Sequence, residues 1–470
     1  MKIPLTINET RQGLKNKDYS VVDVVNAYLD NINKHDNKLN SFITVSTSKA
    51  LKKAEDLDLE IRDKGDKAFD EYPLLGVCVA HKDLYLTKGI RTTAGANVLK
   101  DYIPPYSSTV VDRLDRAGCV TLGKTNCDAW AHGASGENSD FGPTKNPWDM
   151  TRVPGGSSSG SGVAVASNFS LVATGTDTGG SIRCPANFCG VYGFKPTYGA
   201  VSRYGVVAMA SSTDSMGNFS RCARDCETLF NVTKGTDGFD STVTNFDYPI
   251  EKSANKEYVI GIPKEYFVEG IEKEVEKAVM DASKVFAENK IKLQEISLPH
   301  TKYAISVYYI IQTAEVSSNL GRYDGVRFGE NRAAFSPEAK RRIMLGSYVL
   351  SSGYYDAYYL KAMKVRSKLI EDFDNAFSQV DAILAPVMPT SAFKLGEKTS
   401  NPLQMYLADI LTVSANMAGI PGLAIPSGFT KNGLPLGFQL MAPRFGEATL
   451  FNLASMYETW VGYTPQVAVL

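Results

Sequence analysis

Two glycine-rich loops that contain serines lie close together in the chain, and they are the feature that most plainly indicates chemistry. The first spans residues 155–162 and the second spans residues 177–181. The residues between them predict one short helix and one strand. Glycine-rich turns allow backbone N–H groups to converge on a developing oxyanion, and a serine beside such a turn becomes a nucleophile when a base removes its proton. The spacing therefore indicates an acyl-transfer site.

The base that would activate such a serine must come from elsewhere in the chain. Only two of the four histidines, His81 and His132, lie near these segments, since His35 and His300 fall in other parts of the sequence. Lys82 is the stronger candidate, because it follows an apolar run at residues 74–80 that predicts a buried strand, and site residues of α/β folds collect at strand ends. Burial there would disfavour the ammonium and lower the pKa of Lys82, as a general base requires. Taken alone, Lys82 would be read as the partner of a surface carboxylate.

Together these segments resemble the amidase signature family, and the match extends from about Pro73 to the C-terminal end. The resemblance implies that Lys82 is the base, Ser157 a bridging serine and Ser181 the nucleophile, which is a Ser-Ser-Lys variant of the catalytic triad. It also implies a cis peptide bond before Ser157. The proton of Ser181 would pass through the Ser157 hydroxyl to an uncharged Lys82. The oxyanion hole would consist of the backbone N–H groups of Thr178, Gly179, Gly180 and Ser181.

Runs outside this core are similar to one branch of the family, the GatA-type A subunits of glutamyl-tRNA(Gln) and aspartyl-tRNA(Asn) amidotransferases. The branch resemblance implies that Arg342 and Asp409 hold a glutamine substrate and that one of Tyr308 and Tyr309, with Tyr308 preferred, lines the same pocket. An arginine fork binds an α-carboxylate through two hydrogen bonds, and an aspartate accepts from an α-ammonium. It further implies GatB-type and GatC-type partner subunits, which would use the ammonia to form Gln-tRNA(Gln) or Asn-tRNA(Asn). The runs that carry this likeness are residues 201–207, 315–320, 322–327 and 350–359.

Three other interpretations remain open. Only ten residues separate Gly329 from Lys340, where the branch usually has a longer insertion. This difference keeps a free-standing amidase for small aliphatic or aromatic amides in consideration. Residues 118–125 match the Walker A expression, which would indicate a P-loop nucleotidase. A predicted helix precedes this run and a predicted strand lies inside it, an order that argues against a P-loop. A scaffolding protein without enzymatic activity is the third alternative.

Composition adds limits to these interpretations. A net charge of −1 over 470 residues predicts no direct contact with nucleic acid, so a partner would have to hold any tRNA. Neither a membrane-spanning run nor a signal-peptide pattern appears, and the seven cysteines favour reduced thiols in a cytoplasmic protein. The cysteine spacings do not match a zinc site, and we expect neither a metal nor a cofactor.

The elements that must position these residues predict an α/β fold. Strands alternate with helices from residue 74 to about 210, and Lys431-Asn432-Gly433 predicts a hairpin between strands at 423–426 and 436–440. We expect a large, mixed, mostly parallel twisted sheet covered by helices on both faces. The chain would form a single domain over residues 1–470, with an N-terminal helical segment at about 1–65. Further elements are expected as helices at 21–33, 272–286, 304–319 and 357–373 and as strands at 259–262, 293–298 and 382–385.

Overall fold

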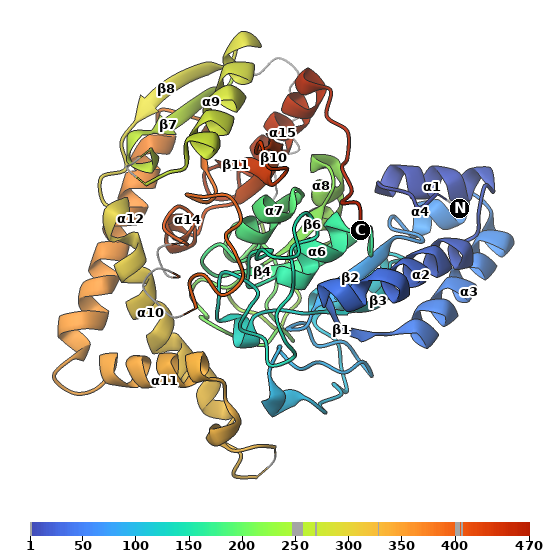
Figure 1. Cartoon of the computed structure of the whole chain (residues 1–470), viewed down its shortest axis with the longest axis horizontal. Helices are drawn as coiled ribbons and strands as arrows, with labels where there is room; N and C mark the ends of the chain where they lie inside the picture. The colour runs from blue at the N-terminus through green and yellow to red at the C-terminus, as the bar shows by residue number, and fades with distance from the viewer. Residues whose placement is uncertain (1, 247–256, 268–269, 328, 400–404, 406–407) are drawn as a thin grey trace.

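A single sheet of eleven strands organises the part of the chain that the computed structural model describes, which is residues 2–246, 257–267, 270–327, 329–399, 405 and 408–470 (Figure 1). The strands lie in the order β1-β3-β2-β4-β6-β5-β10-β11-β9-β7-β8. Their bounds are β1 Phe42–Val45, β2 Cys78–Lys82, β3 Val120–Thr125, β4 Val172–Asp177, β5 Tyr192–Lys195, β6 Ser215–Ser220, β7 Val259–Pro263, β8 Lys292–Ile296, β9 Ala382–Pro386, β10 Gly422–Phe429 and β11 Pro435–Met441.

The sheet is large and mixed, as predicted, but it is not mostly parallel. Four of the ten pairings between neighbouring strands in the described residues are parallel, namely β2 with β3 and β4, and β7 with β8 and β9. The other six are antiparallel. One is β1 with β3 at the edge of the sheet, and five follow one another from β4 to β9, where strand direction alternates. The predicted hairpin is confirmed as the antiparallel pair β10 and β11. Parallel crossovers are therefore confined to the regions on either side of this centre.

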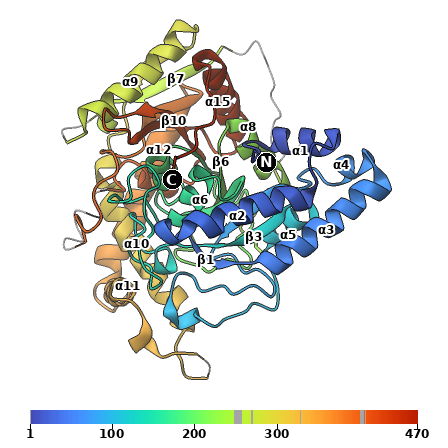
Figure 2. The same ribbon diagram turned by 45° about the vertical axis from the view of Figure 1, so that its right-hand side comes forward.

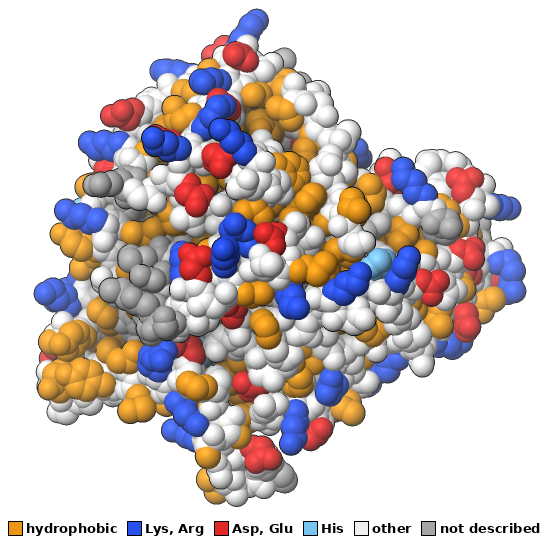
Figure 3. Space-filling view, in the orientation of Figure 1, with side chains coloured by type: hydrophobic (Ala, Val, Ile, Leu, Met, Phe, Trp, Pro, Cys, Tyr) orange, Lys and Arg blue, Asp and Glu red, His pale blue; other side chains and the backbone are white. Residues whose placement is uncertain are grey.

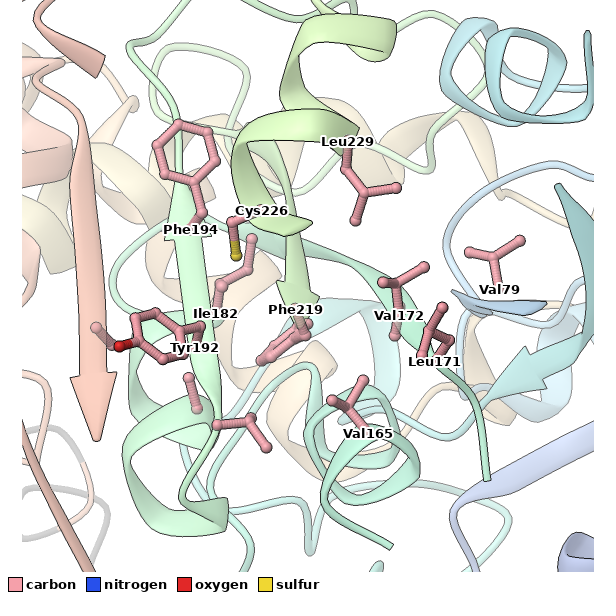
Figure 4. Close-up of a cluster of buried hydrophobic side chains, with 14 of the residues drawn as sticks. Val79, Val165, Leu171, Val172, Ile182, Tyr192, Phe194, Phe219, Cys226 and Leu229 are labelled. Atoms are coloured by element: carbon pink, nitrogen blue, oxygen red, sulfur yellow. The ribbon is translucent and has the colours of Figure 1, made fainter. Parts of the chain in front are cut away.

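Helices cover both faces of the sheet, as neighbouring residues of β5 show. A Cβ atom added to Gly193 would lie 2.4 Å from Cβ of Ala186 in α7. The ring of the next residue, Phe194, lies 5.2 Å from Phe230 of α8 and 4.7 Å from Phe451 of α15, measured between centroids. Since successive side chains of a strand point to opposite faces, α7 covers one face and α8 and α15 cover the other. Figure 4 shows Phe194 among buried side chains that include Cys226 and Leu229, and Figure 2 shows the helices around the sheet in a second view.

The helices of the described chain include most of those expected from the sequence. The helix expected over residues 304–319 has those bounds in α10. The one expected at 357–373 consists of a π-helical segment, Tyr355–Leu360, that continues directly into α12 and ends at Phe377. The α-helices are α1 Ile7–Asn16, α2 Val21–Leu39, α3 Thr47–Lys64, α4 Lys67–Glu71, α5 Thr109–Arg116, α6 Ser159–Ala166, α7 Arg183–Cys189, α8 Ala223–Thr233, α9 Lys273–Glu288, α10 Ala304–Asn319, α11 Pro337–Val349, α12 Lys361–Phe377, α14 Val413–Ala418 and α15 Glu447–Val461. Across the described ranges, none of these helices combines the length and the apolar character needed to span a bilayer.

The N-terminal segment is helical, and the helix expected from residue 21 begins there. The Ser20 hydroxyl accepts the N–H of Asp23 at 3.0 Å, and the Asp23 carboxylate accepts the N–H of Ser20 at 2.9 Å, which is a complete capping box. The helix that starts there was expected to end at residue 33. It continues to Leu39, because the left-handed residue that ends it is Asn40, with φ of 55°. We keep as a proposal that the whole chain is one domain, which the continuous sheet supports.

The strand that carries Lys82 is shorter than the apolar run suggested. Residues 74–77 form a turn, in which the N–H of Val77 donates to the carbonyl of Leu74 at 3.0 Å and Gly76 has φ of 75°. The strand therefore begins at Cys78. All five residues of β2 are buried between its parallel neighbours β3 and β4. The strand nevertheless ends at Lys82, as predicted.

The Walker-like run folds as part of the sheet rather than as a phosphate-binding loop. Gly123, Lys124 and Thr125 belong to strand β3, which follows helix α5. The buried ammonium of Lys124 lies 3.2 Å from Asp83 Oδ1 and donates to the carbonyl of Tyr85 at 2.6 Å. A lysine committed to these partners cannot reach a bound nucleotide. The P-loop alternative is therefore wrong.

Candidate active site

Lys82 lies at the end of β2 with its whole side chain buried. Its Nζ donates hydrogen bonds to Ser157 Oγ and to Thr176 Oγ1, each at 2.8 Å. Burial lowers the pKa of Lys82 to about 8, and the nearby acidic groups, led by Cys127 and Asp128, reverse this only in part. An uncharged amine at the same distance would accept the proton of the Ser157 hydroxyl. This distance and the lowered pKa are what a general base for Ser157 requires, and the role of Lys82 as the base stays a prediction.

The loop that carries Ser157 is held in one conformation by Asp128. The peptide bond between Gly156 and Ser157 is cis, which confirms that expectation. The N–H of Asp128 donates to the Ser157 carbonyl at 3.2 Å, and the Asp128 carboxylate accepts the N–H groups of Gly136 at 3.1 Å and Asn138 at 2.8 Å. A Cβ atom at Gly156 would lie 2.1 Å from Asp128 Oδ2, so only glycine fits there. Asp128 was not identified from the sequence, although it follows the end of β3 as Lys82 ends β2.

Ser181 lies beside the Ser157 loop and keeps a small exposed surface. The N–H of Ser158 donates to the Ser181 carbonyl at 3.2 Å, so the two serine loops are in direct contact. Within the described ranges the Ser181 hydroxyl forms no hydrogen bond. The structure therefore joins Lys82 to Ser157 and brings Ser181 next to them. It does not show a hydrogen bond between the hydroxyls of Ser157 and Ser181, and the relay to Ser181 remains a proposal.

The four residues of the predicted oxyanion hole form the loop from Thr178 to Ser181, and their N–H groups are not equivalent. The N–H of Gly180 donates to Asp177 Oδ1 at 2.9 Å and is already engaged. The N–H groups of Thr178, Gly179 and Ser181 donate to no group in the part of the chain that is described. We therefore propose these three as the donors available to an oxyanion.

A buried ion pair fixes the start of this loop. Arg183 donates from Nε to Asp177 Oδ2 and from Nη2 to Oδ1, both at 3.1 Å. The same guanidinium donates to Asn416 at 2.7 Å and to Gln439 at 2.9 Å, residues of α14 and β11. Burial would raise the pKa of Asp177, but Arg183 and further donors outweigh it and lower the pKa to about 2. The aspartate is thus charged while it holds the Gly180 N–H.

Arg342 and Asp409 are buried, and a tyrosine connects them. The Arg342 guanidinium lies 5.4 Å from the Tyr309 ring centroid, and the Tyr309 hydroxyl lies 3.5 Å from Asp409 Oδ2. Nε of Arg342 also donates to Glu338 at 2.8 Å. Burial raises the pKa of Asp409 to about 8, although the charge of Arg342 acts in the opposite direction. A bound ammonium group would restore the charged carboxylate.

Both tyrosines lie at this site, in different positions. Tyr308 is buried against the oxyanion loop, since a Cβ atom at Gly179 would lie 2.7 Å from Tyr308 Cζ. Tyr309 packs edge to face against Tyr308, with centroids 5.0 Å apart, and contacts Arg342 and Asp409. The preferred Tyr308 therefore adjoins the loop before Ser181. The sequence does not distinguish the role of Tyr309 from that of Tyr308, because two adjacent tyrosines fit the same motif equally well.

The histidines do not offer an alternative base. The ring nitrogens of His81 lie 3.3 Å from Thr174 Oγ1 and 3.2 Å from Thr121 Oγ1, and burial lowers its pKa to about 3. His300 pairs with Asp372 at 2.8 Å. The other two histidines are His35 and His132. In the described chain neither forms a side-chain hydrogen bond with Ser157 or Ser181. Nor do the described residues bring three metal-binding side chains together.

The activity is expected to rise with pH, because the base works in its uncharged form. Below the Lys82 pKa of about 8, kcat should increase by about tenfold per pH unit and then level off. At a saturating concentration of the amide substrate, ionisable groups that affect only substrate binding no longer influence the rate. The pH dependence of kcat then gives the pKa of the base in the enzyme–substrate complex. A stopped assay between pH 5.5 and 9.5 measures this profile. A plateau already at pH 6, or a rate that falls with pH, would contradict a lysine base.

Comparison with known proteins identifies the family of the chain. The family model described as Amidase matches residues 23–451. The A subunit of the glutamyl-tRNA(Gln) amidotransferase from Carboxydothermus hydrogenoformans is 50% identical over 97% of this chain and 96% of its own length. Its counterpart of the same name from Geobacter metallireducens is 47% identical over 99% of both chains. The crystal structure of the corresponding protein from Thermotoga maritima has a TM-score of 0.82 at 37% identity, and the match covers 98% of this chain and 96% of that one.

Proposed function

The chain belongs to the amidase family and is an amide-hydrolysing enzyme, and on that premise we propose that it is the glutaminase subunit of a tRNA-dependent amidotransferase. The observation that carries the choice of substrate is the contact of Tyr309 with both Arg342 and Asp409. These two side chains match the carboxylate and ammonium of a free amino acid. Tyr308 links them to the oxyanion loop. A glutamine held at its amino acid end would reach that loop with its carboxamide.

In the proposed mechanism, two hydroxyls and one amine move the protons. Ser181 attacks the carboxamide carbon while its proton passes to Ser157 and the proton of Ser157 passes to uncharged Lys82. The N–H groups of the oxyanion loop stabilise the negative oxygen of the tetrahedral intermediate. The proton then returns from Lys82 through Ser157 to the amide nitrogen, the carbon–nitrogen bond breaks, and ammonia leaves. Water then attacks the acyl-enzyme while its proton passes through Ser157 to Lys82. The same proton returns to the Ser181 oxygen as the ester bond breaks and glutamate leaves.

The proposed setting is a complex in which a GatB-type subunit uses the ammonia and a GatC-type protein assists assembly. The full-length similarity to A subunits supports this setting. Basic and acidic side chains are interspersed over the face shown in Figure 3, in keeping with a net charge of −1. We therefore propose that a partner binds the tRNA. All seven cysteines are free, which supports a cytoplasmic location.

Asp409 gives a direct test of the substrate assignment. Replacing Asp409 with asparagine should raise KM for glutamine by about tenfold or more, because a neutral amide replaces the acceptor of the α-ammonium. Hydrolysis of glutaric acid monoamide, which is glutamine without its α-amino group, should change by less than about threefold. Steady-state kinetics on both substrates measure the difference. Equal losses on both would show that Asp409 does not bind the ammonium.

The second candidate is a free-standing amidase for small amides, which the short segment between Gly329 and Lys340 favours. The purified chain, alone and with its partner subunits, can be assayed on glutamine and on simple aliphatic and aromatic amides. We expect glutamine to be preferred. Robust hydrolysis of simple amides by the isolated chain would contradict the amidotransferase proposal and support this alternative.

A further inference from the structure

His132 lines a cavity of about 220 Å³ next to Arg342. The residue is completely buried, and neither ring nitrogen forms a hydrogen bond within the described chain. Ser135, Glu338 and Met405 line the same cavity. Buried polar groups almost always have a partner, so a ring with two unused nitrogens needs an explanation. The buried ring of His81, by contrast, has a threonine hydroxyl near each nitrogen.

The backbone before His132 adds a second, independent observation. Trp130 and Ala131 have φ of 58° and 63°, the left-handed region that bulky residues rarely adopt. The surroundings hold this turn in place, since the Trp130 ring stacks on Phe335 with centroids 5.3 Å apart. The Asn138 side chain donates to the His132 carbonyl at 2.7 Å. Unfavourable backbone that is held so firmly is typical of functional sites.

The charge balance at Arg342 shows what this ring could bind. Glu338 accepts from Nε of Arg342 and also pairs with Arg341, so the positive charge near the cavity is partly neutralised. A substrate carboxylate brought there would gain from an additional, uncharged donor. Burial lowers the pKa of His132, and the charge of Arg342 lowers it further, so the ring is neutral. A neutral imidazole carries one N–H donor and one acceptor nitrogen.

We propose that His132 is a specificity-determining residue, whose uncharged ring donates a hydrogen bond to the α-carboxylate of the amino acid amide beside Arg342. The inference rests on the proposed function and deepens it, because it assigns a residue to one end of the glutamine. The two ring nitrogens of His132 would then lack a hydrogen bond in the structure because their partner is the substrate. Selectivity for an α-carboxylate would come from Arg342 and His132 together.

The test replaces His132 with leucine, which has similar volume and no polar atom. The catalytic efficiency on glutamine should fall by about tenfold or more through KM, with kcat within about twofold of the native value. Efficiency on 4-aminobutanamide, which is glutamine without its α-carboxylate, should not change. His132→Asn keeps an N–H donor and should recover part of the loss on glutamine.

Thermal unfolding distinguishes this role from a structural one. Since the ring nitrogens form no hydrogen bond with the described residues, His132→Leu should unfold at the same temperature as the native chain or higher. A variant that fails to fold, no loss on glutamine, or equal losses on both substrates would each overturn the proposal. If the native chain itself does not prefer glutamine to 4-aminobutanamide, the proposed function fails first, and that result is visible before any variant is made.

Discussion

Replacing Lys82 with alanine is expected to reduce kcat/KM by about 10⁴-fold or more while the protein still folds. The reason is that the hydroxyl of Ser157 loses the one amine within hydrogen-bonding distance in the described chain, at 2.8 Å. His81 cannot substitute, because both of its ring nitrogens lie beside threonine hydroxyls. The other buried histidine, His132, forms no hydrogen bond with Ser157 in the described chain. Single-turnover formation of the acyl-enzyme measures the chemical step directly, and circular dichroism checks the fold.

Thr176→Val is the matched control for this variant. Thr176 carries the other hydroxyl that Lys82 Nζ contacts, and valine has the same shape as threonine without that hydroxyl. The substitution leaves Ser157 in place. We expect a loss of about tenfold, since only the orientation of the amine is affected. If Lys82→Ala kept more than about a tenth of the native rate, or if both variants lost the same amount, lysine would not be the base.

Arg183→Met is expected to have the largest effect on stability, lowering the free energy of unfolding by about 3–5 kcal/mol. The change leaves the Asp177 carboxylate buried without its cation and removes the donors to Asn416 and Gln439. Burial would then raise the pKa of Asp177 from its value of about 2. Activity should fall as well, because Asp177 holds the loop before Ser181.

Chemical denaturation of Arg183→Met beside Lys52→Met measures this prediction. The Lys52 ammonium lies 2.8 Å from Asp56, but both side chains are more than half exposed, and such pairs contribute little. We expect no measurable change for Lys52→Met. A similar small change for Arg183→Met would show that the buried network is dispensable.

The sequence identifies those site residues that lie within a recognisable short motif or at the end of a predicted strand. Lys82 ends an apolar run, and the two serines lie in glycine-rich loops, so motif and spacing are sufficient. Asp128 and Arg183 lack such signals. Arg183 reaches Asn416 and Gln439, which are more than two hundred residues away, and only the folded sheet brings them together. The same limit applies to His132, whose unused ring nitrogens are a property of the packed structure.

The fold was predictable where strands are apolar or joined by a turn signal. The hairpin of β10 and β11 followed from Lys431-Asn432-Gly433, and β7 and β9 from short apolar runs. β6 has the sequence Ser-Met-Gly-Asn-Phe-Ser, which contains no β-branched residue and gave no strand signal. It nevertheless lies antiparallel between β4 and β5. Missing this strand is one reason why a mostly parallel sheet was expected.

The most direct test of the proposed mechanism is to locate the acyl group on the enzyme. The native chain is mixed with glutamine, quenched in acid within milliseconds, digested and analysed by mass spectrometry. The mechanism predicts a γ-glutamyl ester on Ser181, which is absent from Ser181→Ala and from Lys82→Ala. An acyl group on Ser157 or on a cysteine, or normal acylation of Ser181 in Lys82→Ala, would contradict it.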